Sequence, residues 1–129
     1  MRKGLALAPD DDVLHMNLGR VYLGRDQPNK ARFHCGQAIE LNTHRDDARE
    51  CMCLALLMMG RNVEAHKVLS PALRDRMPLS RYLLASSLAI RNEDPIGARR
   101  WLEAAAKVYG NRPEILEELN RIPAPSSPR

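Results

Sequence analysis

The stretch DVLHMNLGRVYLGRDQPNKARFHCGQAIELN, residues 12–42, has the pattern of two amphipathic helices joined by a short turn, RDQP. Apolar side chains recur at helical spacing on both sides of this turn. Asp11 or Asp12 can cap the first helix, and Pro28 suits the first turn of the second because a proline there loses no helical hydrogen bond. The stretch therefore predicts an antiparallel helical hairpin.

Small side chains recur along the chain with a nearly constant period of about 34 residues. A fixed period of this length is typical of stacked helical hairpins, which approach closely only where the side chains between them are small. The predicted fold class is therefore all-α, an α-solenoid of antiparallel helical hairpins. Three sets of positions carry the period: Ala31, Ala65 and Ala98; Ala38, Ala72 and Ala105; Gly19, Cys53 and Ser86.

The period divides the sequence into repeats of one predicted domain, residues 1–122. Pro71 falls three turns into a helix, so we expect an irregular second helix in the second repeat. Ser80 is the expected N-cap of the third repeat. The predicted segments are a partial repeat over 1–10, repeats over about 12–45, 46–78 and 79–112, a capping helix over 113–122 and a disordered tail over 123–129.

Composition excludes some classes of function. The chain has 129 residues and a net charge of +4, and its basic residues are scattered among sixteen acidic ones, so no nucleic-acid partner is expected. The longest apolar run, residues 51–59, is too short to span a membrane. Three cysteines without framework spacing suggest reduced thiols and a cytoplasmic protein, although an upstream leader would change the location.

The first repeat resembles the tetratricopeptide repeat, through Leu18, Gly19, Tyr22 and Ala31. The later repeats are more degenerate, and His15, Cys35 and Thr43 replace family residues in the first. The matching positions in the later repeats are Gly60, Ala65 and Ala72, and then Tyr82, Ala98 and Ala105. The resemblance covers roughly residues 3–112. It implies a right-handed superhelix whose first helices line a concave groove for a partner protein.

The same register implies which residues face that groove. The surface is mainly aliphatic and Met-rich, which suits an adaptable apolar site for a partner peptide or helix. We therefore expect an adaptor, chaperone or assembly factor rather than an enzyme, similar to bacterial pilus-assembly and secretion-associated members of the family. The expected groove residues are Val13, Met16, Asn17, Arg20, Leu23, Glu50, Leu54, Leu57, Met58, Leu83, Ser87 and Ile90.

Catalysis, cofactors and metal binding have little support in the sequence. Cys35 and His66 could form a dyad, but no base or oxyanion donor is placed beside the sulfur, and no glycine-rich phosphate loop occurs. Cys51 and Cys53 are two residues apart on a predicted helix, so their side chains should diverge rather than hold a metal. No catalytic residue, cofactor or metal ligand is therefore assigned.

Two alternatives to the groove stay open. The chain could self-associate as a homodimer through its N-terminal end, where Leu5, Leu7, Val21 and Tyr22 would lack a covering helix. It could also be a redox-linked or metal-linked regulator, which would require thiol-dependent activity or a retained metal. Light scattering and elemental analysis distinguish these alternatives from a monomeric binding module.

Overall fold

A computed structural model describes residues 11–123 of the protein. All regular elements in this range are helical, so the predicted all-α class is confirmed. The predicted partial repeat over residues 1–10, with Leu5 and Leu7, and the tail after Pro123 lie outside the described residues. The helices are α1 (Asp12–Gly24), α2 (Pro28–Leu41), α3 (Asp46–Met58), α4 (Asn62–Leu69), α5 (Leu79–Arg91), α6 (Pro95–Tyr109) and α7 (Pro113–Arg121), and a 3₁₀ turn, η2 (Ser70–Ala72), follows α4.

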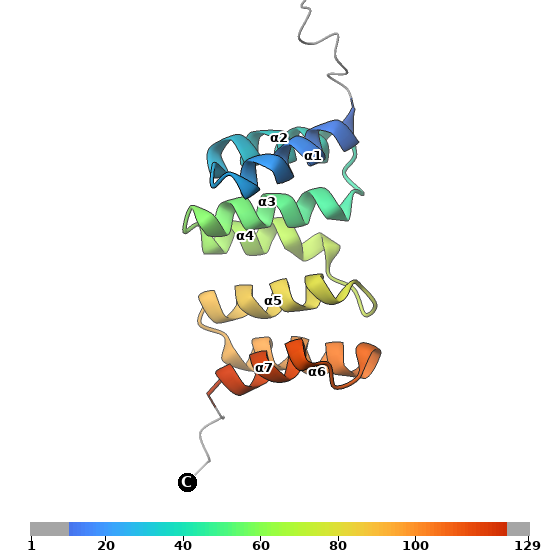
Figure 1. Ribbon diagram of the computed structural model, residues 1–129, viewed down its shortest axis with the longest axis vertical. Helices are drawn as coiled ribbons and strands as arrows, with labels where there is room; N and C mark the ends of the chain where they lie inside the picture. Colours follow the sequence, from blue (N-terminus) through green and yellow to red (C-terminus); the bar gives the residue numbers. More distant parts are fainter. Residues whose placement is uncertain (1–10, 124–129) are drawn as a thin grey trace, which may run out of the picture. The chain divides into compact units, whose positions relative to one another are not determined.

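The chain divides into two compact units, residues 1–72 and residues 73–129. In the first unit α1 packs against α2 and α3 packs against α4, and α3 also contacts both α1 and α2 (Figure 1). Two hairpins are thus joined through α3. The prediction of a single domain over residues 1–122 stays a prediction.

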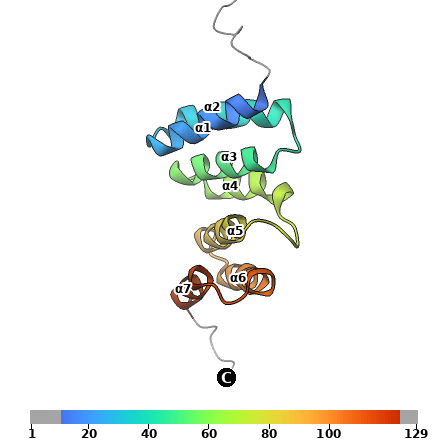
Figure 2. The same ribbon diagram turned by 45° about the vertical axis from the view of Figure 1, so that its right-hand side comes forward.

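The second unit is a hairpin of α5 and α6 with α7 packed against α6 (Figure 2). Its core includes a large, fully buried side chain from each of the three helices, namely Tyr82, Leu102 and Ile115. Because Ile115 belongs to this core, α7 is an integral part of the second unit.

Most helices begin where the sequence predicts. The Asp11 carboxylate accepts a hydrogen bond from the Leu14 amide at 3.0 Å, and Asp94 caps α6 through the Gly97 amide at 2.9 Å. The predicted cap at Ser80 is wrong, because α5 begins at Leu79 and Pro78 is its N-cap. The fixed φ of Pro78 already suits this position, and its carbonyl accepts from the Arg81 amide at 2.9 Å.

The second hairpin ends irregularly, as Pro71 predicts. Helix α4 stops at Leu69 and tightens into η2, which contains the proline. A proline lacks the amide hydrogen that would donate the next α-helical hydrogen bond, so α4 ends in a 3₁₀ turn instead. The expectation of an irregular second helix is confirmed.

The turns inside the three hairpins share one backbone geometry. Asp26, Gly60 and Glu93 have positive φ values of 59°, 76° and 61°. The amide that follows each of them donates to a carbonyl five residues earlier, from Gln27 to Tyr22, from Arg61 to Leu56 and from Asp94 to Ala89. This is the Schellman arrangement, which satisfies the last helical carbonyls. The three turns recur with the same period as the small residues of the sequence.

The helix boundaries repeat with this period too. Helices α1, α3 and α5 begin at residues 12, 46 and 79, and α2, α4 and α6 begin at residues 28, 62 and 95. Helix α7 begins at residue 113, one further period after the start of α5. The period in the sequence therefore corresponds to a real interval between helices.

The recurring small residues are all buried. The six alanines of the repeated positions are fully buried, and Cys53, Ser86 and Gly19 are also buried. A Cβ atom added at Gly19 would lie 2.5 Å from the Cys35 Sγ and 2.8 Å from the Cys51 Sγ. Small side chains at these positions are thus required by close helix packing, as predicted.

Candidate functional site

Five of the predicted groove residues lie on the surface of the first unit, on α1 and α3. Val13, Leu54 and Met58 are 41%, 41% and 43% exposed, although they are large apolar side chains. Asn17 and Arg20 are exposed as well. Spacings of three or four residues place the α1 members on one side of α1 and the α3 members on one side of α3. We call these five residues the α1–α3 face.

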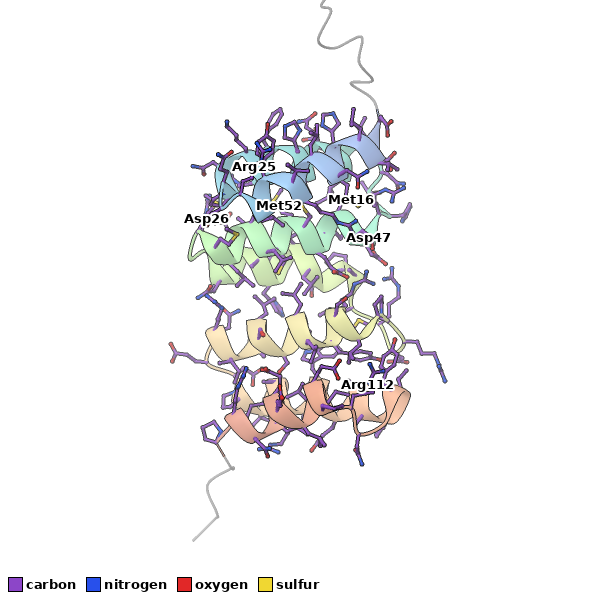
Figure 3. The ribbon with its side chains drawn as sticks, viewed as in Figure 1. Met16, Arg25, Asp26, Asp47, Met52 and Arg112 are labelled. Atoms are coloured by element: carbon purple, nitrogen blue, oxygen red, sulfur yellow. A yellow bond between two sulfur atoms is a disulfide. The ribbon has the colours of Figure 1, made fainter. Side chains whose placement is uncertain are left out.

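An ion pair links the two helices of this face. The Arg20 Nη2 atom lies 4.0 Å from the Asp47 Oδ2 atom, and both side chains are about half exposed, at 54% and 50%. Figure 3 shows Asp47 at the beginning of α3. A pair with this exposure contributes little to stability. Its value here is geometric, because it shows that the outer sides of α1 and α3 adjoin.

Other predicted groove residues are less accessible. Met16 is 5% exposed and packs in a cluster with Ala38 and Ala48, between the helices of the first unit (Figure 3). Leu57 is 8% exposed, and Leu23 and Glu50 are half-buried. In this structure Met16 and Leu57 present almost no surface to a partner.

In the second unit, two predicted residues line a pocket. Ser87 and Ile90 of α5 meet side chains of α7 and the residues after it, around a pocket of about 270 Å³. Leu83 does not line it and packs against the core instead. The sequence analysis did not assign any residue of α7 to a binding site. The available signal was the start of α7, which lies one period after the start of α5. The other lining residues are Ser86, Arg91, Glu118, Arg121, Ile122 and Pro123.

The cysteines differ from the expectation. Cys35 of α2 and Cys51 of α3 form a disulfide, with an S–S distance of 2.04 Å and a Cα–Cα distance of 5.9 Å. The prediction of reduced thiols is therefore wrong for this pair, because helix packing brings the two sulfur atoms together beneath Gly19. Disulfides persist mainly in oxidising environments, so the thiols no longer support a cytoplasmic location.

Cys53 is the free cysteine of the described chain, and it is buried. Burial of the thiol, followed by the negative charge of Glu50, raises its pKa to about 12. A thiol with this pKa is almost never a nucleophilic thiolate near neutral pH. The imagined Cys35–His66 dyad has no free thiol here either, because Cys35 is in the disulfide, and His66 is exposed on α4.

An aromatic cluster on the first hairpin was not anticipated. The His34 ring stacks on Tyr22 with centroids 5.5 Å apart, and the exposed Phe33 ring meets His34 edge-on at 5.1 Å. The Nδ1 atoms of His15 and His34 are 3.1 Å apart, a hydrogen bond in which one ring donates and the other accepts. Burial, and then the charge of His15, lowers the pKa of His34 below its ordinary value. No sequence spacing shows that these rings meet.

Residues 11–123 contain neither a metal-binding cluster nor a membrane-spanning helix. Among residues 11–123, no three His, Cys, Asp or Glu side chains gather closely enough to hold a metal ion. No helix in the same range has the length and apolar character required to cross a membrane. Comparison with known proteins yields neither a matching family model nor a matching curated protein.

Proposed function

We propose that this chain is a non-catalytic protein-interaction module that binds a partner peptide or helix on the α1–α3 face. The observation that carries the proposal is the exposure of large apolar side chains, Val13 on α1 and Leu54 and Met58 on α3, on two helices that the Arg20–Asp47 ion pair links. Large apolar side chains that stay exposed next to polar ones are typical of interaction surfaces. The module would serve as an adaptor, chaperone or assembly factor.

The proposal includes the tetratricopeptide-like solenoid expected from the sequence. Helix starts and hairpin turns that repeat with the period of the small residues support it. In such arrays the first helix of each repeat lines the binding surface. The α1–α3 face is built from two first helices, and the α5–α7 pocket contains a first helix and the helix that begins one period later.

The chemistry of the face favours an apolar partner segment. Met58 is flexible and polarizable, so it can adapt to different side chains, whereas Val13 and Leu54 present fixed aliphatic surface. Arg20 and Asp47 would orient the segment through polar contacts. An amphipathic helix that presents its apolar side is the occupant that this arrangement fits best.

A paired-variant capture experiment tests the proposal. Leu54→Glu combined with Met58→Glu places two charges on the face, and Val63→Glu combined with Ile96→Glu is the matched control. Val63 and Ile96 are 63% and 62% exposed and lie on second helices. Proteins captured from the native source should be retained by wild type and control and lost from the face variant. Equal capture by all three folded proteins would rule out the face.

Self-association is the second candidate, and a separate observation favours it. Phe33, whose ring meets His34 edge-on, is 59% exposed, and Val21 of the same hairpin is 48% exposed. A second copy could cover this aromatic surface across a two-fold axis. Light scattering at high micromolar concentration tests it, since a dimer should become a monomer in Phe33→Glu, whereas a wild-type monomer would exclude this candidate.

A further inference from the structure

A second pocket in the unit of residues 73–129 lies between the segment before α5 and helix α6. Its volume is about 380 Å³, which is large enough for a bulky side chain with neighbouring atoms. The apolar part of its lining is Leu73 on one side and Trp101, Ala104 and Val108 of α6 on the other. It shares no lining residue with the α1–α3 face or the α5–α7 pocket.

One wall of this pocket comes from the irregular segment 73–78, which two tyrosines hold in place. Tyr82 is buried and Tyr109 is half-buried. The Tyr82 hydroxyl of α5 donates to the Asp75 carbonyl, and the Tyr109 hydroxyl of α6 donates to the Met77 carbonyl at 2.6 Å. The Arg74 amide also contacts the Met77 sulfur at 3.4 Å. Segment 73–78 is therefore fixed although it is neither helix nor strand, so the pocket exists before a ligand arrives.

The charged lining gives the pocket an excess of positive charge. Arg74 and Lys107 line it together with a single carboxylate, that of Asp75. Lys107 lies on the side of α6 that carries Trp101 and Ala104, and it forms no ion pair with any residue in 11–123. A lysine in this position can lay its stem on the apolar wall and keep its ammonium group at the opening.

We propose that this pocket binds a partner polypeptide through a large apolar side chain followed in sequence by an acidic residue. The apolar wall accepts the side chain, and the excess of cations at the opening attracts the carboxylate. The proposal goes beyond the α1–α3 face, because it assigns a second site, in the other unit, with a sequence preference of its own.

Trp101 is the only tryptophan of the chain, so its fluorescence reports on the pocket directly. The full chain is titrated with the blocked peptide acetyl-Gly-Leu-Glu-Gly-amide and with two controls, in which Gln replaces Glu or Ser replaces Leu. The Leu-Glu peptide should give a saturable change. The Gln peptide should bind about threefold more weakly, as expected for one exposed charge pair, and the Ser peptide should not bind.

Protein variants locate the binding. Lys107→Gln should remove the preference for Glu over Gln, whereas the matched control Lys67→Gln, on an exposed part of α4, should keep it. Ala104→Leu should fill the pocket and abolish the change, with circular dichroism to confirm folding. If Ala104→Leu fails to fold, the variants Lys107→Gln and Lys67→Gln, titrated with the three peptides, still test whether the pocket is the binding site.

Three outcomes would overturn this inference. The first is the absence of a saturable fluorescence change with the Leu-Glu peptide, and the second is an unchanged preference for Glu over Gln in Lys107→Gln. The third is an affinity for N-acetyl-leucine equal to that for the Leu-Glu peptide, which would indicate that the ligand is a small amphipathic acid instead of a polypeptide. The Leu54→Glu and Met58→Glu variant should bind the Leu-Glu peptide normally. Failure of the pocket is thus distinguishable from failure of the α1–α3 face.

Discussion

Asp26 and Glu93 hold the same backbone position in two different hairpins, with φ values of 59° and 61°, and Gly60 holds it in the hairpin between them. Left-handed backbone is strained for residues that have a Cβ atom, and aspartate tolerates it better than glutamate. The repeated turn therefore uses one suitable residue and two less suitable ones, which makes its energetics testable.

Glu93→Gly should raise the free energy of unfolding by up to about 1 kcal/mol, and Asp26→Gly should raise it by less. Gly60→Ala should lower it by about 1 kcal/mol through the backbone alone, because the added Cβ would meet no atom within 4 Å. Urea unfolding followed by circular dichroism measures all three changes. A stabilising Gly60→Ala would contradict the shared turn geometry.

Gly19→Ala and Gly24→Ala should have opposite effects, although both glycines are in α1. At Gly19 the new methyl group meets both sulfur atoms of the disulfide, so we expect a loss of about 1–3 kcal/mol from overpacking. At Gly24 nothing lies within 4 Å, so better helix propensity should add up to about 1 kcal/mol. The midpoints of urea unfolding, compared at an unchanged m-value, measure both effects. A Gly19→Ala variant as stable as the wild type would show that the helices are not closely packed there.

The His34 ring should make stability depend on pH. Burial and the His15 charge lower the pKa of His34 below 6.5, so the unfolded chain takes up the proton first as the pH falls. The free energy of unfolding should decrease as the pH falls below about 6.5 and level off below the folded pKa. His34→Gln should remove this part of the pH dependence, and substitution of the exposed His44 should not. Equal profiles for the two variants would contradict the assignment.

The cysteines predict a specific alkylation pattern. With a pKa of about 12 against an ordinary 9.0, the Cys53 thiolate should be about a thousandfold scarcer in the folded chain at pH 8 than in the unfolded chain. Mass spectrometry after iodoacetamide treatment without reductant should find no adduct on the native protein and one adduct after unfolding. Three adducts would disprove the disulfide, and rapid native labelling of Cys53 would disprove its burial.

The sequence was sufficient for features that depend on local chemistry and period. The helix at Pro28 and the irregular end at Pro71 follow from rules that act within one or two turns of helix, and the buried small residues follow from the period of about 34 residues. The cap predicted at Ser80 is two residues too late, because Pro78 has the backbone angles that the N-cap position requires.

The disulfide and the aromatic cluster needed three-dimensional packing. Cys35 and Cys51 lie 16 residues apart on different helices, and no spacing rule shows that their sulfur atoms meet. The contact of His15 with His34 depends on how α1 is rotated against α2. Met16 and Leu57 share a predicted groove register with exposed neighbours, and only the packing shows that they are buried.

The most direct test of the account is site-specific photo-crosslinking. A benzoylphenylalanine is placed at Leu54 on the α1–α3 face or at Val63 on α4, both exposed positions of the first unit, and the full chain is irradiated in extract from its native source. Position 54 should give a discrete protein adduct, and position 63 should give none. Adducts from position 63 with none from position 54 would contradict it.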